Sequence, residues 1–267
     1  MAGLMVGTSG GSRPRSHART RSLVMALALS LLLTTVGVPA RAAPPGPNAR
    51  FPDLAMAQLT DFAIERPAPG TRWLRFTTII ANVGIGALRV RGYDPLANGE
   101  LHVMQKVYDG GTWATIHTPA RLYWSGDGHN HWHIRDLETY ELRSASAPNA
   151  PPLRVGVKHG FCFSDNWAYR LSMPRAPQAA YYTSCGHAPA DTYVRMGLSV
   201  GWGDRYGWDI VDQYIDISGL PLGQYLLTAT ADKQNWFAET NNANNSTTAR
   251  IQIHSARVIV LDPGVGA

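Results

Sequence analysis

From residue 51 onward the chain is a succession of short β-forming runs separated by turn residues, and this pattern restricts the fold more than any other feature. Residues 73–80 alternate in polarity and are rich in β-branched and aromatic side chains, as strands are. No segment keeps a helical period over the length of a helix. The sequence therefore predicts an all-β fold, a β-sandwich with long ordered loops. Further strands are expected at 101–108, 132–142, 214–217, 224–230 and 249–253.

Two regions need a separate interpretation. Residues 214–217 and 224–230 are expected to form a hairpin around the turn residues 219–223. Residues 164–213 hold many aromatic and glycine residues but few strand periods. Long irregular stretches in compact domains are usually functional or disordered, and the chain's 11 tyrosines and 8 tryptophans argue against disorder. We expect ordered loops around a site.

The N-terminal segment has the organisation of a secretory signal. Residues 1–22 carry four arginines and no acidic residue, an apolar run follows from Leu23 to Val38, and Ala40-Arg41-Ala42 is a small-x-small site. We expect a signal peptide over 1–42, cleaved after Ala42, and a secreted product without a membrane span, since the apolar run is short for one. An uncleaved anchor is the alternative. The remaining parts are expected to be a Pro-rich flexible lead-in at 43–50, one domain at 51–254 and a loose tail at 255–267.

Cleavage would change the charge of the protein. The whole chain carries 24 Lys+Arg and 19 Asp+Glu, a net charge of +5, and five of the arginines lie in 1–42. The mature chain is therefore near neutrality, and no nucleic-acid partner is inferred. Its two cysteines, Cys162 and Cys185, are expected to form one disulfide in an oxidising compartment, worth roughly 3 kcal/mol in the chain-entropy picture. Two buried thiols are the alternative.

Three of the chain's nine histidines fall within five residues, in the sequence His129-Asn130-His131-Trp132-His133. Side chains at i, i+2 and i+4 of a strand share one face, so the three imidazoles are expected to form a metal site with open positions. Imidazole suits copper, zinc, iron and nickel alike, so the spacing does not identify the metal. An exposed polar face is the alternative.

A cupin-like metal-dependent oxygenase is a second interpretation of this segment, because His131-x-His133 precedes Glu138. Cupins need a further histidine in a later Pro-x-Gly-x-x-His segment. The comparable stretch begins at Pro221 and ends in Leu226. That difference weakens the cupin interpretation.

The order of three segments resembles the lysyl oxidase family, over most of residues 51–254. The first is the His-x-His-x-His copper segment described above. The second is a Lys followed by Phe-Cys-x-x-Asp, here Lys158 to Asp165. The third is Asp-x-Tyr-Gly-x-Asp-Ile followed by Gln-x-Ile-Asp-Ile, here Asp204 to Ile210 and Gln213 to Ile217.

The resemblance implies a copper-dependent amine oxidase of the protein-lysine 6-oxidase class. Copper would be bound by His129, His131 and His133. Lys158 and Tyr206 match the residues that the family cross-links into lysine tyrosylquinone, a protein-derived cofactor whose carbonyl reacts with amines. A primary amine or a lysine-containing peptide would be oxidised by O₂ to an aldehyde, with release of ammonia and hydrogen peroxide. Asp209 and Asp212 are candidates for the general base.

The resemblance also implies a calcium site. Oxygen ligands suit this hard cation. Asn241 stands where a relative has Asp, which removes one negative charge, and an Asn-rich turn is the alternative. The implied ligands are Asp53, the Leu54 carbonyl, Glu239, Asn241, Asn244 and Asn245.

With only two cysteines the chain is similar to a compact, bacterial-type member of the family, so peptidyl lysine, free lysine and simple amines all remain open as substrates. The sequence does not indicate an oligomeric state. A binding module is the remaining alternative, because residues 222–232, followed by Glu239 and the Asn run, resemble the last strands of extracellular Ig-like domains. Such a module would need neither the histidines nor Lys158 and Tyr206.

Overall fold

The computed structural model describes residues 44–126, 128–156 and 160–267, and within these ranges all regular structure is β-strand. The described residues belong to one unit, Arg41–Ala267. No helix in them is long and apolar enough to cross a membrane. The expected signal peptide lies outside the described residues. The prediction of an all-β fold is confirmed, and its strands form three antiparallel sheets.

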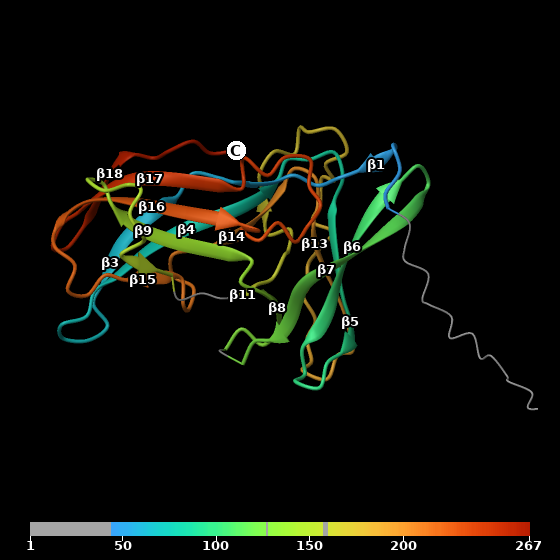
Figure 1. Cartoon of the computed structure of the whole chain (residues 1–267), viewed down its shortest axis with the longest axis horizontal. Helices are drawn as coiled ribbons and strands as arrows, with labels where there is room; N and C mark the ends of the chain where they lie inside the picture. The colour runs from blue at the N-terminus through green and yellow to red at the C-terminus, as the bar shows by residue number, and fades with distance from the viewer. Residues whose placement is uncertain (1–43, 127, 157–159) are drawn as a thin grey trace, which may run out of the picture. The chain divides into compact units, whose positions relative to one another are not determined.

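The seven-stranded sheet occupies the right half of Figure 1. Strands β5, β6 and β7 are its long central members, and in β6 buried and half-buried side chains alternate as in a sheet with one covered face. The order is β11 (Gly160–Phe161), β8 (Trp132–Arg135), β7 (Thr112–Trp124), β6 (Leu101–Asp109), β5 (Leu88–Pro95) and β13 (Tyr193–Leu198), with β1 (Ala49–Arg50) paired to β6.

The two remaining sheets lie in the left half of Figure 1. The five-stranded sheet has the order β10 (Arg154–Val155), β9 (Glu138–Ser144), β16 (Gly223–Ala231), β17 (Ser246–Ile253) and β18 (Val258–Asp262). The six-stranded sheet has the order β12 (Trp167–Ala168), β14 (Trp202–Tyr206), β4 (Trp73–Asn82) and β15 (Tyr214–Asp216), and β2 (Leu54–Met56) and β3 (Thr60–Glu65) also pair with β4.

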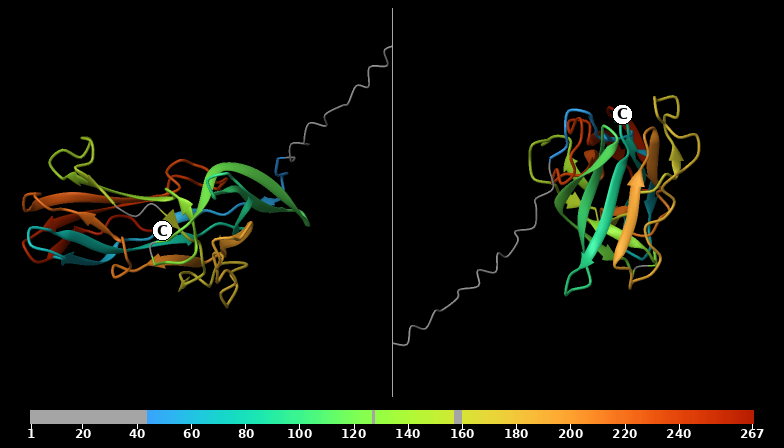
Figure 2. Two further views of the ribbon diagram at one scale, coloured as in Figure 1. Left: turned by 90° about the horizontal axis from the view of Figure 1, so that it is seen from below. Right: turned by 90° about the vertical axis from the view of Figure 1, so that its right-hand side faces the viewer.

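These two sheets pack on each other through large apolar side chains, and Figure 2 shows them as two layers. The Phe76 ring of β4 meets the Tyr140 ring of β9 edge to face, with centroids 5.0 Å apart. Both residues are almost fully buried. Aromatic pairs in this arrangement contribute about 0.5–1.5 kcal/mol beyond the burial of their area. The predicted sandwich therefore has its core here.

Several strand predictions need correction. The run 132–142 is two strands, because Asp136 has a positive φ of 51° and breaks the chain between β8 and β9. The predicted hairpin of 214–217 with 224–230 does not form: β15 pairs with β4, and the Tyr214 ring stacks on Trp73 at 3.9 Å. Strand β16 pairs instead with β9 and β17.

The region 164–213 and the chain ends also differ from expectation. Residues 193–206 hold two strands, β13 and β14, whose short runs are interrupted by glycines and, in β14, by Asp204 and Arg205, residues that weaken the sequence pattern of a strand. The lead-in already contains β1. The expected loose tail is wrong, since β18 pairs with β17 and the Ala267 amide donates to the Met56 carbonyl at 3.1 Å.

Candidate metal centre

The three histidines converge. One ring nitrogen from each of His129, His131 and His133 lies within 4.8 Å of the others. The Nε2 atoms of His131 and His133 are 2.8 Å apart. The ring centroids are separated by 4.6 to 5.5 Å. Three nitrogen donors facing one point is the arrangement that binds a borderline metal such as copper or zinc, so the donor set fits the metal that the sequence implies.

Strand alternation explains only part of this geometry. His133 lies in β8, but His129 and His131 precede the strand in a turn where Asn130 has a positive φ of 50°. Two backbone hydrogen bonds hold the turn: Ser125 donates to the His131 carbonyl at 3.0 Å, and Trp132 donates to the Cys185 carbonyl at 3.1 Å. The histidine cluster therefore depends on the turn as well as on the strand.

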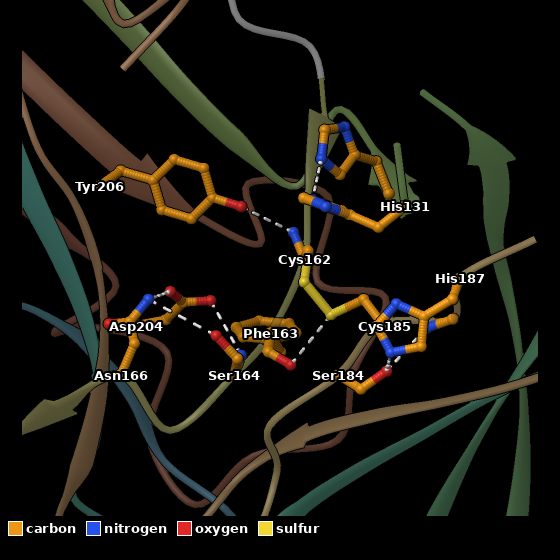
Figure 3. The surroundings of a disulfide bond; sticks show 12 residues. His131, Cys162, Phe163, Ser164, Asn166, Ser184, Cys185, His187, Asp204 and Tyr206 are labelled. Atoms are coloured by element: carbon orange, nitrogen blue, oxygen red, sulfur yellow. Dashed lines mark hydrogen bonds between the residues drawn. A yellow bond between two sulfur atoms is a disulfide. The ribbon is translucent and has the colours of Figure 1, made fainter. Parts of the chain in front are cut away.

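A buried tyrosine lies next to this strand system. Tyr206 ends β14 and is only 5% exposed. Its ring stacks on Phe161 with centroids 4.4 Å apart, and Phe161 pairs with Ile134 of β8. The Tyr206 hydroxyl accepts a hydrogen bond from the Cys162 amide at 3.0 Å, as Figure 3 shows. Burial raises the pKa of the Tyr206 phenol well above its ordinary value, and the Asp204 charge raises it further.

The backbone approaches the histidines most closely at Gly160. A Cβ added there would lie 2.1 Å from the Tyr123 hydroxyl and 2.5 Å from His133 Nδ1, so only glycine fits. The Tyr123 ring meets His133 edge to face at 5.7 Å. Lys158, the other residue of the expected cofactor, lies outside the described residues. Gly160, two positions later, packs directly on the histidine cluster.

Two buried carboxyl groups that the sequence did not single out as proton acceptors act on Tyr206. Glu138 and Asp204 are 3% and 1% exposed, and the charge of each raises the pKa of the Tyr206 phenol. Tyr140 donates a hydrogen bond of 2.6 Å to Glu138 Oε2. Asp204 accepts from the Ser164 amide at 2.9 Å and from Asn166 Nδ2 at 2.5 Å.

The two carboxylates that the sequence suggested as the general base, Asp209 and Asp212, are less buried than Glu138 and Asp204. Asp209 is exposed and Asp212 is half-buried with a positive φ of 64°. Sequence proximity to Tyr206 was the reason for choosing them. Glu138 could have been found only by knowing that β9 of the five-stranded sheet packs on β4 at Thr78, the residue that pairs with Tyr206 of β14.

The disulfide between Cys162 and Cys185 is confirmed, with Cα atoms 5.9 Å apart. It joins the segment after β11 to the loop 164–192 (Figure 3). The buried Asp165 carboxylate extends this support, because it accepts from the amides of Tyr181, Tyr182 and Ser199 at 2.8 to 3.1 Å. The long loop is thus ordered, as the sequence indicated.

Oxygen-rich side chains from both ends of the domain meet in a second cluster. Glu239 Oε2 accepts from the Leu54 amide at 2.5 Å, and Glu239 Oε1 accepts from Asn245 Nδ2 at 2.9 Å. Asn244 Nδ2 donates to Asp53 Oδ1 at 2.7 Å. Burial raises the pKa of the Glu239 carboxyl to about 8.

The donor set of this oxygen cluster fits a hard cation. The Oδ1 atoms of Asn244 and Asn245 are buried and have no hydrogen-bond partner among the described residues. Buried oxygens of this kind are costly unless something satisfies them, and calcium binds such atoms. Asn241 behaves as the turn alternative predicts, since its Oδ1 accepts from the Ala243 amide at 3.0 Å.

The fold and the site define the class of the protein: an all-β domain in which three histidines that could hold a metal ion lie near a buried tyrosine. The lysyl oxidase family model matches residues 96–262. The chain therefore belongs to the lysyl oxidase family.

Curated relatives share part of this chain. It is 29% identical over 162 residues to protein-lysine 6-oxidase of Homo sapiens, covering 58% of this chain and 34% of the human protein. It is 28% identical over 131 residues to lysyl oxidase homolog 4 of Mus musculus, covering 49% of this chain and 15% of the mouse protein. The chain thus spans about a third or less of the length of these two relatives.

Proposed function

We propose that this protein is a secreted copper-dependent amine oxidase of the protein-lysine 6-oxidase class. A primary amine, O₂ and water would be converted to an aldehyde, ammonia and hydrogen peroxide. The observation that carries the proposal is the convergence of three imidazole nitrogens next to a strand pair that buries Tyr206. Family membership, and relatives named protein-lysine 6-oxidase, support the same activity.

Each residue has a distinct part in the proposed chemistry. His129, His131 and His133 would hold copper, and Lys158 and Tyr206 would form lysine tyrosylquinone, which supplies the electrophilic carbonyl and the electron sink when present. Phe161, stacked on the Tyr206 ring, fixes the plane of that ring and excludes water from one face. The Cys162 amide, which donates to the Tyr206 oxygen, would stabilise negative charge there.

We assign to Glu138 the removal of the proton from the α-carbon of the amine. Glu138 is buried, its charge acts on Tyr206, and Tyr140 fixes one of its oxygens. Tyr140 is itself anchored by Thr78, at 3.3 Å, whose backbone pairs with Tyr206. A positioned carboxylate of this kind contributes typically 10²–10⁴-fold to a rate, so roughly that loss follows from its removal.

Amine-dependent release of hydrogen peroxide tests the proposal. The copper-loaded protein should oxidise at least one of two compounds, a simple primary amine and a lysine peptide. Tyr206→Phe should abolish the release of hydrogen peroxide while copper is retained. Tyr225→Phe is the matched control, because Tyr225 is also buried and its hydroxyl donates to the Pro221 carbonyl at 2.6 Å, on β16. An active Tyr206→Phe variant would refute the cofactor assignment, and copper binding without any turnover would favour an oxygenase or a binding module.

We also propose that the oxygen cluster binds calcium as a structural ion. Asp53, the Leu54 carbonyl, Glu239, Asn244 and Asn245 would be the ligands, with a weaker contribution from Asn241, which already bonds the backbone. A cation there would satisfy the two buried amide oxygens and offset the cost of burying Glu239. It would also fasten β2, near the start of the domain, to the turn before β17.

Secretion is proposed on two grounds. The leader has the organisation of a signal peptide, cleaved after Ala42, and the disulfide is of the kind that persists in oxidising compartments. Sequencing the N-terminus of the protein recovered from the medium would test it, and the expected first residue is Ala43.

A further inference from the structure

A separate pocket of about 320 Å³ lies away from both clusters. Its walls come from β1, the turn before β5, the β6–β7 hairpin and the loop 164–192. None of the histidines, Tyr206 or the oxygen-cluster residues lines it. Its volume falls at the lower end of the range of small-molecule sites.

The charged residues that line this pocket are all cationic: Arg50, Arg89 and Arg175. No acidic residue is among its described lining residues. Since the mature chain is near neutral, three guanidinium groups around one small hollow are not a consequence of overall charge. A pocket of this composition attracts an anion, and guanidinium groups bind carboxylates and phosphates through paired hydrogen bonds.

Aromatic rings form the rest of the wall. Arg50 lies over the Tyr108 ring at 4.7 Å, and Arg89 lies over the Trp113 ring at 4.1 Å. Trp113 and Tyr181 are nevertheless 42% and 63% exposed, so part of each ring remains available to a ligand. Exposed Trp and Tyr beside Arg is the composition enriched at binding hot spots.

The pocket is built before any ligand arrives. Arg89 Nε donates to the Tyr182 hydroxyl at 2.8 Å, which fixes the guanidinium. Asp165 holds the Tyr181 and Tyr182 amides on one side and the Ser199 amide on the other. A wall held in this way binds without a large ordering cost.

We propose that this pocket binds a small aromatic oxyanion, in which a carboxylate or phosphate on a planar ring pairs with the arginines while the ring stacks on Trp113 or Tyr181. The charge and the rings select for both parts of such a ligand. Inorganic phosphate satisfies only the arginines, and a neutral aromatic alcohol satisfies only the rings. Both should therefore bind more weakly.

Calorimetric titration of the purified protein tests the proposal with benzoate, phenyl phosphate, inorganic phosphate and benzyl alcohol. Saturable binding of benzoate or phenyl phosphate is expected, at least about tenfold tighter than that of the other two compounds, because benzyl alcohol lacks the charge that pairs with the arginines and inorganic phosphate lacks the ring that stacks. Arg175→Gln and Arg50→Gln should each weaken binding by about tenfold, because each substitution removes a charge-assisted hydrogen bond to the oxyanion.

The controls separate this pocket from the rest of the protein. Arg195→Gln removes another arginine that lies over a tyrosine ring, at 5.7 Å from Tyr193 but outside the pocket, and should leave affinity unchanged. His131→Ala, with its metal centre disrupted, should bind the same compounds equally well. The proposal would be overturned if no compound bound saturably, or if Arg175→Gln and Arg50→Gln bound the compounds as tightly as the unsubstituted protein does. Equal affinity for phenyl phosphate and inorganic phosphate would overturn the role of the rings.

Discussion

The histidine cluster and the oxygen cluster are assembled in opposite ways. The histidines are contributed by five consecutive residues in one turn and the start of one strand. The oxygen cluster joins Leu54 to Glu239 across 185 positions of sequence. The difference indicates what each site depends on: the first on a local turn and its neighbours, the second on the closure of the whole domain.

Their surroundings differ as well. The histidine cluster lies where the sheets meet, with β8 from the seven-stranded sheet, Glu138 on β9 and Tyr206 on β14. A site at such a junction can use side chains from all three sheets. The oxygen cluster instead links β2 to the segment before β17, which suits a structural ion.

The largest effect is expected from His131→Ala. With one of three donors removed, copper should be lost on dialysis, no quinone should form, and turnover should fall below detection. His117→Ala is the control, because His117 bonds the Tyr93 hydroxyl at 2.7 Å on β7, away from the cluster. The stabilisation by calcium should persist in both variants. A normal quinone in His131→Ala would show that the histidines are not the copper site.

Glu138→Gln should lower kcat by roughly 10²–10⁴-fold while leaving the quinone spectrum unchanged. The glutamine oxygen can still accept from Tyr140, so the substitution removes the proton acceptor and keeps the contact. Asp209→Asn, on the exposed neighbour, should have no comparable effect. If Glu138→Gln kept the full kcat and the full single-turnover rate, another carboxylate would be the proton acceptor.

Removal of the disulfide should have an intermediate effect, and it should affect the histidine cluster more than the oxygen cluster. The double variant Cys162→Ser with Cys185→Ser should lose roughly 3 kcal/mol of unfolding free energy, measured by urea denaturation. Copper affinity should also fall, because the Cys185 carbonyl holds Trp132 between two of the histidines. Calcium affinity should not change. If the affinities for copper and calcium fell equally, the two clusters would not be independent.

The smallest effect concerns calcium. At a hundredfold excess over Kd, a bound ion adds about 2.7 kcal/mol, which raises Tm by on the order of 5–10 °C for a domain of this size. Asn245→Ala should reduce the calcium-induced rise in a thermal-unfolding scan. Asn242→Ala, an exposed neighbour, should not. Magnesium giving the same rise as calcium would argue against the site.

How much the sequence could predict follows from the same contrast. The alternation in 73–80 and 101–108 identified β4 and β6, and the close histidine spacing identified a candidate metal site without any knowledge of topology. The proposed role of Glu138 was not visible, because it depends on the packing of β9 on β4 beside Tyr206. The hairpin at 214–230 was wrong for a similar reason: the turn residues were correct, but β15 finds its partner in β4, about 140 residues earlier.

In the proposed amine oxidase, Lys158 and Tyr206 form a quinone beside a copper ion held by three histidines. A visible absorption spectrum of the copper-loaded, aerated protein, recorded with and without phenylhydrazine, tests it most directly. We expect a quinone band that phenylhydrazine converts to a strongly absorbing adduct, and we expect neither the band nor the adduct in Tyr206→Phe. A flat spectrum with copper bound would contradict it.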